Sequence, residues 1–220
     1  IVMERCLGSV GLAIGDIDRC CSTGYGRFTI PFADINFSEI TCHGMGAFRT
    51  DSSIRTVIDI GGQDCKVISV DGRGRVVDFV MNDKCAAGTG RSLEILAKTI
   101  GVPLEELGPL AVKSRKPVDI TNKCSIFMEL EVIDSLYRGK KKKDIAGGLS
   151  DAVARRVAAL AESIEMKGAA CITGGVSKNR AVVKHLERRL GLRFTALGVD
   201  PQLMGALGAA VLAMEARDEM

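Results

Sequence analysis

Three short apolar runs near the middle of the chain restrict its fold more than any other feature. The runs occupy residues 54–60, 64–70 and 75–81 and are rich in β-branched side chains. Gly61-Gly62 and Asp71-Gly72 separate them, and such dipeptides are typical of the tight turns that join antiparallel strands. The sequence therefore predicts a three-stranded antiparallel meander.

Helical periodicity dominates the part of the chain that follows. Residues 144–166 carry apolar side chains at steps of three or four, which predicts a long helix with one buried stripe. Other helices are expected at residues 38–47, 92–98, 103–107, 125–137, 180–190 and 204–210, and other strands at residues 17–22, 168–173 and 192–196. This order predicts a complete α/β lobe over residues 54–220, with its last helix packing back toward residues 1–53, the remainder of another lobe.

Composition excludes several classes of protein. The chain has 220 residues, of which 46% are hydrophobic, so it can bury a substantial core. Its net charge of +3 is too small to indicate nucleic-acid binding. No apolar run reaches the roughly 20 residues that span a bilayer, and no leader peptide is visible. We expect a cytoplasmic protein that binds neither nucleic acid nor membrane.

Two glycine-rich loops each follow a predicted strand. Asp59 lies at the end of the first strand, and Gly61-Gly62 come next; glycines let a backbone approach a polyphosphate, and an aspartate there can hold Mg²⁺ through water. Gly174-Gly175 and Asn179 connect the strand at residues 168–173 to a helix, an order that suits a docked ligand. Either loop alone also fits an ordinary turn, but the two together favour nucleotide binding.

The eight cysteines fall into two groups. Cysteines of a cytoplasmic chain are more often structural, catalytic or metal-binding than disulfide-linked, and no C-x-x-C pair occurs. Six lie in or beside apolar stretches, where we expect buried packing: Cys6, Cys20, Cys21, Cys42, Cys65 and Cys171. Cys85 and Cys124 instead stand just ahead of predicted helices. A helix N-terminus favours a thiolate or a metal–sulfur cluster, so we predict that these two cysteines form half of a metal site.

Six stretches give the sequence a family resemblance. They are residues 23–27 (TGYGR), 38–47 (SEITCHGMGA), 57–64 (VIDIGGQD), 81–91 (MNDKCAAGTGR), 173–179 (TGGVSKN) and 205–210 (GALGAA). With them the chain resembles the BadF/BadG/BcrA/BcrD-type ATPases, which include activators of 2-hydroxyacyl-CoA dehydratases and the ATPase subunits of benzoyl-CoA reductase. The resemblance implies an α/β fold of the actin/hexokinase/Hsp70 type, in which two RNase H-like lobes clamp ATP and Mg²⁺.

The resemblance also implies roles for the nucleotide-binding residues. It places Gly61 and Gly62, with Asp59, at the β- and γ-phosphates. The residues implied at the adenosine are Gly174, Gly175 and Asn179. Asp59 and Gln63 are the expected catalytic residues.

For the cysteines, the resemblance implies one [4Fe–4S] cluster bound by Cys85 and Cys124 together with the same pair from a second subunit. The count agrees, because such a cluster usually takes four thiolates and each chain offers two at predicted helix starts. Reduced ferredoxin or flavodoxin is expected to load the cluster. ATP is then expected to drive the electron to a partner enzyme that acts on a CoA thioester.

One departure from the family pattern concerns the start of the chain. Members of the family begin with a D-x-G-S/T strand-turn that binds phosphate, and nothing like it precedes Ile1. We therefore expect this sequence to be a fragment with an incomplete N-terminal lobe, and expect the polypeptide alone to be inactive or nearly so in ATP turnover.

The choice among functions remains open at this point. Residues 107–111 and 116–118 favour a benzoyl-CoA reductase ATPase subunit, and a dehydratase activator is the alternative. A small-molecule kinase of the same fold, with Cys85 and Cys124 as buried thiols, is the alternative from another class. Iron analysis distinguishes the kinase, because it needs no metal–sulfur cluster.

Overall fold

A four-stranded sheet forms the centre of the computed structural model, which describes residues 2–82 and 85–218. Its strand order is β5 (Val76–Asn82), β4 (Cys65–Val70), β3 (Ile54–Ile60) and β6 (Ala169–Thr173). β3, β4 and β5 pair antiparallel, whereas β3 and β6 run parallel. The predicted meander is confirmed.

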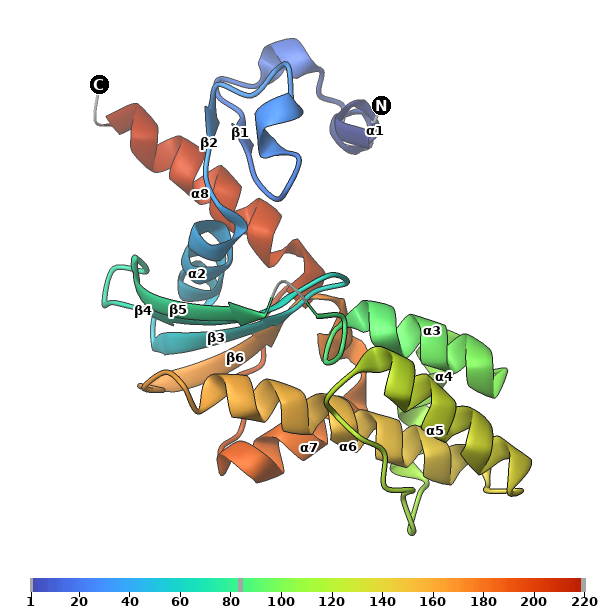
Figure 1. Ribbon diagram of the computed structural model, residues 1–220. Coiled ribbons are helices and arrows are strands. Elements are labelled where there is room, and N and C mark those ends of the chain that lie inside the picture. Colours follow the sequence, from blue (N-terminus) through green and yellow to red (C-terminus); the bar gives the residue numbers. More distant parts are fainter. Residues whose placement is uncertain (1, 83–84, 219–220) are drawn as a thin grey trace.

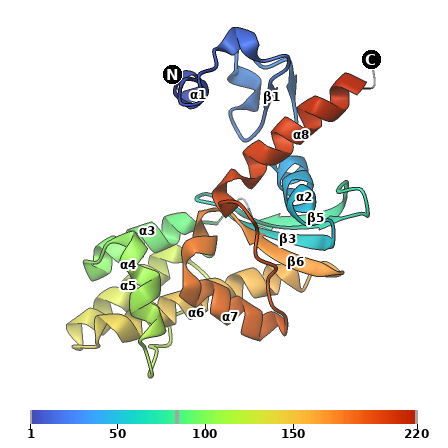
Figure 2. The same ribbon diagram turned by 180° about the vertical axis from the view of Figure 1, so that it is seen from behind.

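Helices cover both faces of this sheet and extend past one end (Figures 1 and 2). One face carries α2 (Glu39–Thr50) and α8 (Met204–Asp218), and the other carries α6 (Lys142–Ala161) and α7 (Arg180–Leu190). Beyond the end where β3 and β6 finish lie α3 (Gly90–Ile100), α4 (Leu104–Val112) and α5 (Ser125–Tyr137). The chain is therefore an α/β structure, as the order of patterns predicts.

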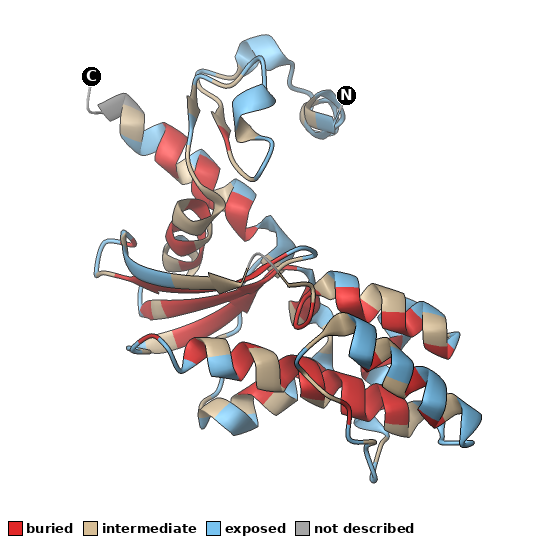
Figure 3. Cartoon of the chain, in the orientation of Figure 1, coloured by how far each residue is buried: buried red, intermediate tan, exposed pale blue. Residues whose placement is uncertain are grey.

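The main hydrophobic core lies between the sheet and the helices α3 to α7 (Figure 3). β3 and β4 are buried on both faces, which explains why their sequences are continuous apolar runs rather than alternating ones. β5 is one of the two edge strands, and its residues are exposed or partly buried. A smaller core, including Ala47, Val57 and Cys171, fills the space beneath α2.

Close contact between α2 and α8 depends on glycine. A Cβ atom at Gly46 would overlap the carbonyl oxygen of Met204, and one at Gly208 would overlap the carbonyl oxygen of Cys42. The small residues of the last helix therefore let its backbone pack closely against α2.

The first part of the chain has little regular structure. It contains α1 (Val2–Gly8), the 3₁₀ turns η1 (Ile14–Asp16) and η2 (Arg27–Thr29), and the short parallel strands β1 (Cys21–Ser22) and β2 (Ile35–Asn36). It lies beside α8, where Arg19 Nη1 donates a hydrogen bond to the carbonyl oxygen of Ala216 at 2.8 Å. The division of the chain after residue 53 remains a prediction.

Three sequence predictions need correction. Residues 192–196 form no strand, because the amides of Leu192 and Phe194 bond to Glu187 at the end of α7, and only the Thr195 amide reaches β6, at the Ala170 carbonyl. The long helix ends at Ala161 instead of residue 166. Just after its end, the hydroxyl of Ser163 donates to the Leu160 carbonyl oxygen and closes a turn.

The third correction concerns the cysteines. Cys42, Cys65 and Cys171 are buried as expected, but Cys20 and Cys21 are only partly buried, and Cys6 is exposed. Cys6 lies on α1, a short helix that buries none of its residues.

Within the described part of the chain, no helix is both long enough and apolar enough to cross a membrane.

Candidate functional site

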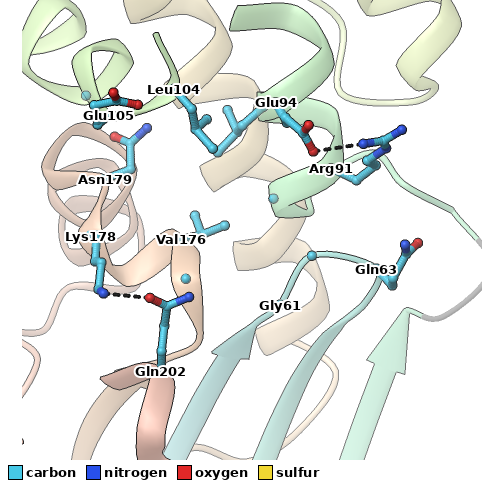
Figure 4. Close-up of a pocket in the computed structure, with 15 residues that line it drawn as sticks. Gly61, Gln63, Arg91, Glu94, Leu104, Glu105, Val176, Lys178, Asn179 and Gln202 are labelled. Atoms are coloured by element: carbon cyan, nitrogen blue, oxygen red, sulfur yellow. Dashed lines mark hydrogen bonds and ion pairs between the residues drawn. The ribbon is translucent and has the colours of Figure 1, made fainter. Parts of the chain in front are cut away.

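A cavity of about 510 Å³ opens where β3 and β6 end, between these strands and the helices α3, α4 and α7. Figure 4 shows the 15 residues that line it. Five of the predicted site residues are among them: Gly61, Gly62, Gln63, Gly175 and Asn179. Both predicted glycine loops therefore face one cavity, although they lie far apart in the sequence.

The Gly61-Gly62 turn is held from two sides. Within the turn, the Gly61 amide donates to the Asp64 carbonyl oxygen at 3.0 Å. From outside, the amides of Gly90 and Arg91 donate to the carbonyl oxygens of Gly61 and Gly62 at 2.8 and 3.0 Å. These last two bonds join the turn to the first residues of α3, so the turn cannot shift without disturbing that helix.

The second loop requires glycine at position 174. Gly174 has a φ of +80°, a backbone conformation that residues with a side chain rarely adopt. A Cβ at this position would also overlap the carbonyl oxygen of Ile60 and lie 2.8 Å from Asp59 Oδ1. Gly174 does not itself line the cavity. It brings the two loops together, so that Gly175 and Asn179 face the cavity. Asn179 is the N-cap of α7, where its side chain accepts hydrogen bonds from the amides of Ala181 and Val182.

Local sequence patterns do not predict the rest of the cavity wall. It includes Leu104, Glu105 and Gly108 from α4, and Lys178 beside Gln202, with Lys178 Nζ 2.6 Å from Gln202 Oε1 (Figure 4). These residues come from separate elements that only the fold brings together. Gly108 lets α4 approach this wall closely, because a Cβ at this position would lie 2.9 Å from Asn179 Oδ1.

Asp59 lies beneath the turn rather than in the cavity wall. It is 4% exposed, and its Oδ1 accepts a hydrogen bond from Thr173 Oγ1 at 2.9 Å. His43 Nδ1 is 2.9 Å from the same Thr173 oxygen, so His43 is a hydrogen-bonded, partly buried residue beside Asp59. Lys66 Nζ lies 3.7 Å from Asp59 Oδ2. Both oxygens of Asp59 therefore face partners within the protein, and its carboxylate does not line the cavity.

The two cysteines predicted to bind metal occupy different positions. Cys124 is the N-cap of α5, and its carbonyl oxygen accepts the first helical bond from Met128 at 3.0 Å, as its helix-start position predicts. Cys85 is not a cap, because α3 begins at Gly90 with Thr89 as its N-cap. The prediction of a helix N-terminus at Cys85 is therefore wrong, since the first amides of α3 bond to the glycine turn instead.

Both cysteines nevertheless suit a thiolate-bound metal centre. The structure describes each as a free cysteine that is partly exposed, unlike the fully buried Cys65 and Cys171. Across residues 2–82 and 85–218, no group of three or more His, Cys, Asp or Glu side chains could hold a metal ion. The prediction that Cys85 and Cys124 are metal ligands therefore requires donors from outside this chain, because a [4Fe–4S] cluster usually takes four thiolates.

Each cysteine-bearing segment is tied to the body of the protein in its own way. Asn82 Nδ2 donates to the Cys85 carbonyl oxygen at 3.0 Å, and the aliphatic part of Arg156 on α6 packs against Gly88. Ahead of Cys124, Arg155 on α6 donates to the carbonyl oxygen of Ile120.

A row of exposed apolar side chains continues along α5 behind Cys124. The row consists of Ile126, Phe127, Leu130, Ile133 and Tyr137. Their spacing of one to four residues places them along the outside of the helix. Exposed apolar side chains that lie next to one another are a feature of protein contact sites.

Comparison with known proteins gives consistent matches over the whole chain. The model of the BadF/BadG/BcrA/BcrD ATPase family matches residues 2–213. The 2-hydroxyisocaproyl-CoA dehydratase activator of Clostridioides difficile is 42% identical over 218 residues, which is 99% of this chain and 82% of that protein. A subunit of benzoyl-CoA reductase from Thauera aromatica is 30% identical over 210 residues, covering 93% of this chain and 74% of that protein.

A solved structure supports the same relationship. The activator of the 2-hydroxyisocaproyl-CoA dehydratase from Clostridium difficile with bound ADPNP superposes with a TM-score of 0.93 at 41% identity. The match covers all of this chain and 83% of that one.

Proposed function

Because the chain belongs to the BadF/BadG/BcrA/BcrD ATPase family, we propose that it is the activator ATPase of a 2-hydroxyacyl-CoA dehydratase. In this role it uses ATP to drive low-potential electron transfer to the dehydratase. The observation that carries the proposal is the pair of backbone hydrogen bonds between the Gly61-Gly62 turn and the start of α3. They join the nucleotide cavity directly to the segment that contains Cys85.

ATP or ADP occupies the cavity in this proposal. Gly61 and Gly62 present backbone to the phosphates, with Gln63 at the rim, and Gly175 and Asn179 lie on the adenosine side. Gly174 holds the second loop against β3. Asp59 acts on Mg²⁺ through water from beneath the turn, which its buried and partnered carboxylate permits.

Cys85 and Cys124 would hold half of a [4Fe–4S] cluster, and the same residues of a second subunit would hold the other half. When bound, the cluster supplies a one-electron carrier whose potential depends on hydrogen bonds, charge and solvent around its sulfur ligands. The partly exposed thiols and the apolar row on α5 support an arrangement in which a second copy of the chain covers this surface.

Nucleotide affects the cluster ligands through the backbone of α3. Phosphates that contact the Gly61-Gly62 turn would change the geometry of its hydrogen bonds with the amides of Gly90 and Arg91. The segment from Cys85 to Thr89 would then move with the start of α3. A change in exposure or hydrogen bonding at Cys85 then changes the potential of the bound centre. Reduced ferredoxin or flavodoxin is the proposed electron donor.

The comparisons favour a dehydratase as the partner over benzoyl-CoA reductase. The dehydratase activator is 42% identical to this chain, against 30% for the reductase subunit. The preference for the reductase that residues 107–111 and 116–118 suggest has less support, because neither stretch has a physical connection to the substrate. The CoA thioester is bound by the partner enzyme, so these stretches carry no information about it.

Reconstitution tests the proposed function. The full-length natural polypeptide, purified without oxygen, is mixed with ATP, Mg²⁺, a reductant and either a 2-hydroxyacyl-CoA dehydratase or the catalytic subunits of benzoyl-CoA reductase. We expect ATP-dependent dehydration in the first mixture and none of the reductase product in the second. The opposite result would assign the protein to the reductases, and an iron-free protein that phosphorylates a small molecule would assign it to the kinases.

A further inference from the structure

A buried cluster of charges lies beneath the Gly61-Gly62 turn, outside the cavity wall. Its centre is Lys66, which lies on β4 opposite Asp59 and is 2% exposed. Lys66 Nζ is 2.5 Å from Asp64 Oδ1, 3.7 Å from Asp59 Oδ2 and 3.7 Å from Glu39 Oε1. Burying an ammonium group is costly unless it is paired. Three carboxylates from α2, β3 and the glycine turn supply that pairing.

Lys66 completes the positioning of two carboxylates that flank the turn. Asp59 accepts from Thr173 Oγ1 at Oδ1 and faces Lys66 at Oδ2. Asp64 accepts from the Tyr25 hydroxyl at Oδ2, at 2.7 Å, and from Lys66 at Oδ1. A carboxylate held at both oxygens does not rotate freely, so Lys66 fixes the orientation of Asp64. Asp59 Oδ2 lies 3.7 Å from Lys66 Nζ, where the ammonium group attracts it as an ion pair.

The backbone of the turn does not depend on Lys66 in the same way. It is closed by the bond from the Gly61 amide to the Asp64 carbonyl oxygen and braced by the amides of Gly90 and Arg91. Lys66 does not line the cavity. Loss of its charge therefore disturbs the carboxylates more than the surface that receives the nucleotide.

We propose that Lys66 is a positioning residue for ATP hydrolysis, acting through Asp59 and Asp64; this rests on the ATPase function proposed above. Hydrolysis joins a water oxygen to the γ-phosphorus and breaks the bond to the β-phosphate oxygen, releasing ADP, inorganic phosphate and a proton. Asp59 and Asp64 are buried beneath the phosphate turn and do not line the cavity, so they act on the attacking water and its proton through intervening water rather than by direct contact. A misplacement of such groups by about 1 Å can lower a rate about 100-fold.

The test compares hydrolysis with binding in the full-length natural polypeptide. For Lys66→Met we expect kcat to fall about 100-fold, while the Kd for ADP stays within about threefold of wild type, and Lys66→Arg should recover part of the rate because it restores a cation. Lys167→Met is the matched control, since its ammonium group is exposed and pairs only with Glu165 among the described residues. It should hydrolyse ATP at the wild-type rate.

Two further variants keep the test decisive if Lys66→Met folds poorly. Asp64→Asn combined with Lys66→Met removes one charge of each sign, and should fold, bind ADP and remain about as slow as Lys66→Met alone. Tyr25→Phe removes one hydrogen bond to Asp64 and should slow hydrolysis about fivefold, the equivalent of one such bond.

The outcomes separate this inference from the proposed function. A double variant that hydrolyses ATP at close to the wild-type rate would show that Lys66 only balances the charge of Asp64, and would overturn the inference. A loss of ADP affinity that parallels the loss of kcat would do the same. A wild-type protein that hydrolyses no ATP would contradict the proposed function, and the inference with it.

Discussion

The two segments that carry Cys85 and Cys124 differ in how they are joined to the rest of the molecule. The Cys85 segment leads into α3, whose first amides bond to the carbonyl oxygens of Gly61 and Gly62 at the cavity. The Cys124 segment caps α5 and is anchored through Ile120 to Arg155 of α6. No corresponding bond between the Cys124 segment and the glycine turn occurs within the described residues.

This difference indicates a division of labour between the two cysteines. In the proposed function, a change at the nucleotide phosphates would reach Cys85 through the two backbone hydrogen bonds of Gly90 and Arg91. Cys124 would stay on a helix start anchored to α6. We infer that nucleotide alters the bound centre chiefly from the Cys85 side. The following predictions test that asymmetry. The first is replacement of either cysteine, which should remove the bound iron whichever segment carries the change.

Replacement of either cysteine has the largest expected effect. Cys85→Ser or Cys124→Ser leaves the shared cluster without two of its four thiolates in a symmetric dimer, so we expect complete loss of bound iron. Both side chains are partly exposed, and the free energy of unfolding should change by less than about 0.5 kcal/mol. Metal analysis after anaerobic purification measures the first quantity and denaturant unfolding of the metal-free protein the second. Cys6→Ser is the control, and should keep all its iron.

Thiol reactivity in the metal-free protein should separate the same two cysteines from the core. Burial raises the pKa of Cys65 and of Cys171 to about 12, so at pH 8 only about one thiol in 10,000 is ionised. We expect iodoacetamide to modify Cys85 and Cys124 at least about 100 times faster. Raising the pH increases the ionised fraction of the buried thiols, so the difference between their modification rates and those of Cys85 and Cys124 should become smaller. Peptide mass mapping over time follows each site, and equal rates would contradict the described burial.

Gly90→Val should disturb the Cys85 segment selectively. A Cβ at this position would lie 3.1 Å from the Gly61 carbonyl oxygen, so a larger side chain pushes α3 away from the turn at a cost of about 1–3 kcal/mol. We expect ADP to bind about tenfold more weakly, equivalent to about 1.4 kcal/mol, and its effect on the electron paramagnetic resonance spectrum to be lost.

The matched control for this variant is Gly198→Val, because nothing lies within 4 Å of a Cβ at Gly198. Its ADP affinity and spectrum should match the wild type. A Gly90→Val protein that still responds fully to ADP would show that the backbone bonds to the turn do not carry the signal.

Arg155→Met should give the smallest effect, on the Cys124 side alone. It removes the hydrogen bond to the Ile120 carbonyl oxygen, worth about 1 kcal/mol. It also removes the partly exposed ion pairs of Arg155 with Asp119 and Asp151, which contribute little. We expect iron release to a chelator to be about fivefold faster, with ADP affinity and the spectral response to ADP unchanged. Arg138→Met, which removes an exposed ion pair on α5, should leave the release rate as in wild type. A lost response to ADP would show that both segments transmit the signal.

Local patterns in the sequence predict most of the scaffold. The meander follows from β-branched runs and glycine turns, and α5 and α7 begin and end where their sequences indicate. Apolar residues also predict a strand at residues 192–196, but the amides there are used by Glu187 at the end of α7. Local sequence does not show which partner an amide takes.

The candidate site is predictable only in part for the same reason. Glycine loops and cysteines are visible as short motifs, and five predicted residues do line one cavity. The position of Cys85 outside a helix start depends on bonds to Gly61 and Gly62, which come from another element. No local pattern predicts the role of Lys66 either, because its partners meet only in the folded structure. They are Glu39, Asp59 and Asp64, with Thr173 bonded to Asp59.

The most direct test of the account is an iron and sulfide determination on the anaerobically purified dimer, combined with its electron paramagnetic resonance spectrum with and without ADP. The account predicts about four irons and four sulfides per dimer, and a spectrum of the reduced protein that changes when ADP binds. A colourless, iron-free dimer, or a spectrum that ADP leaves unchanged, would contradict a shared centre held by Cys85 and Cys124 and controlled from the glycine turn.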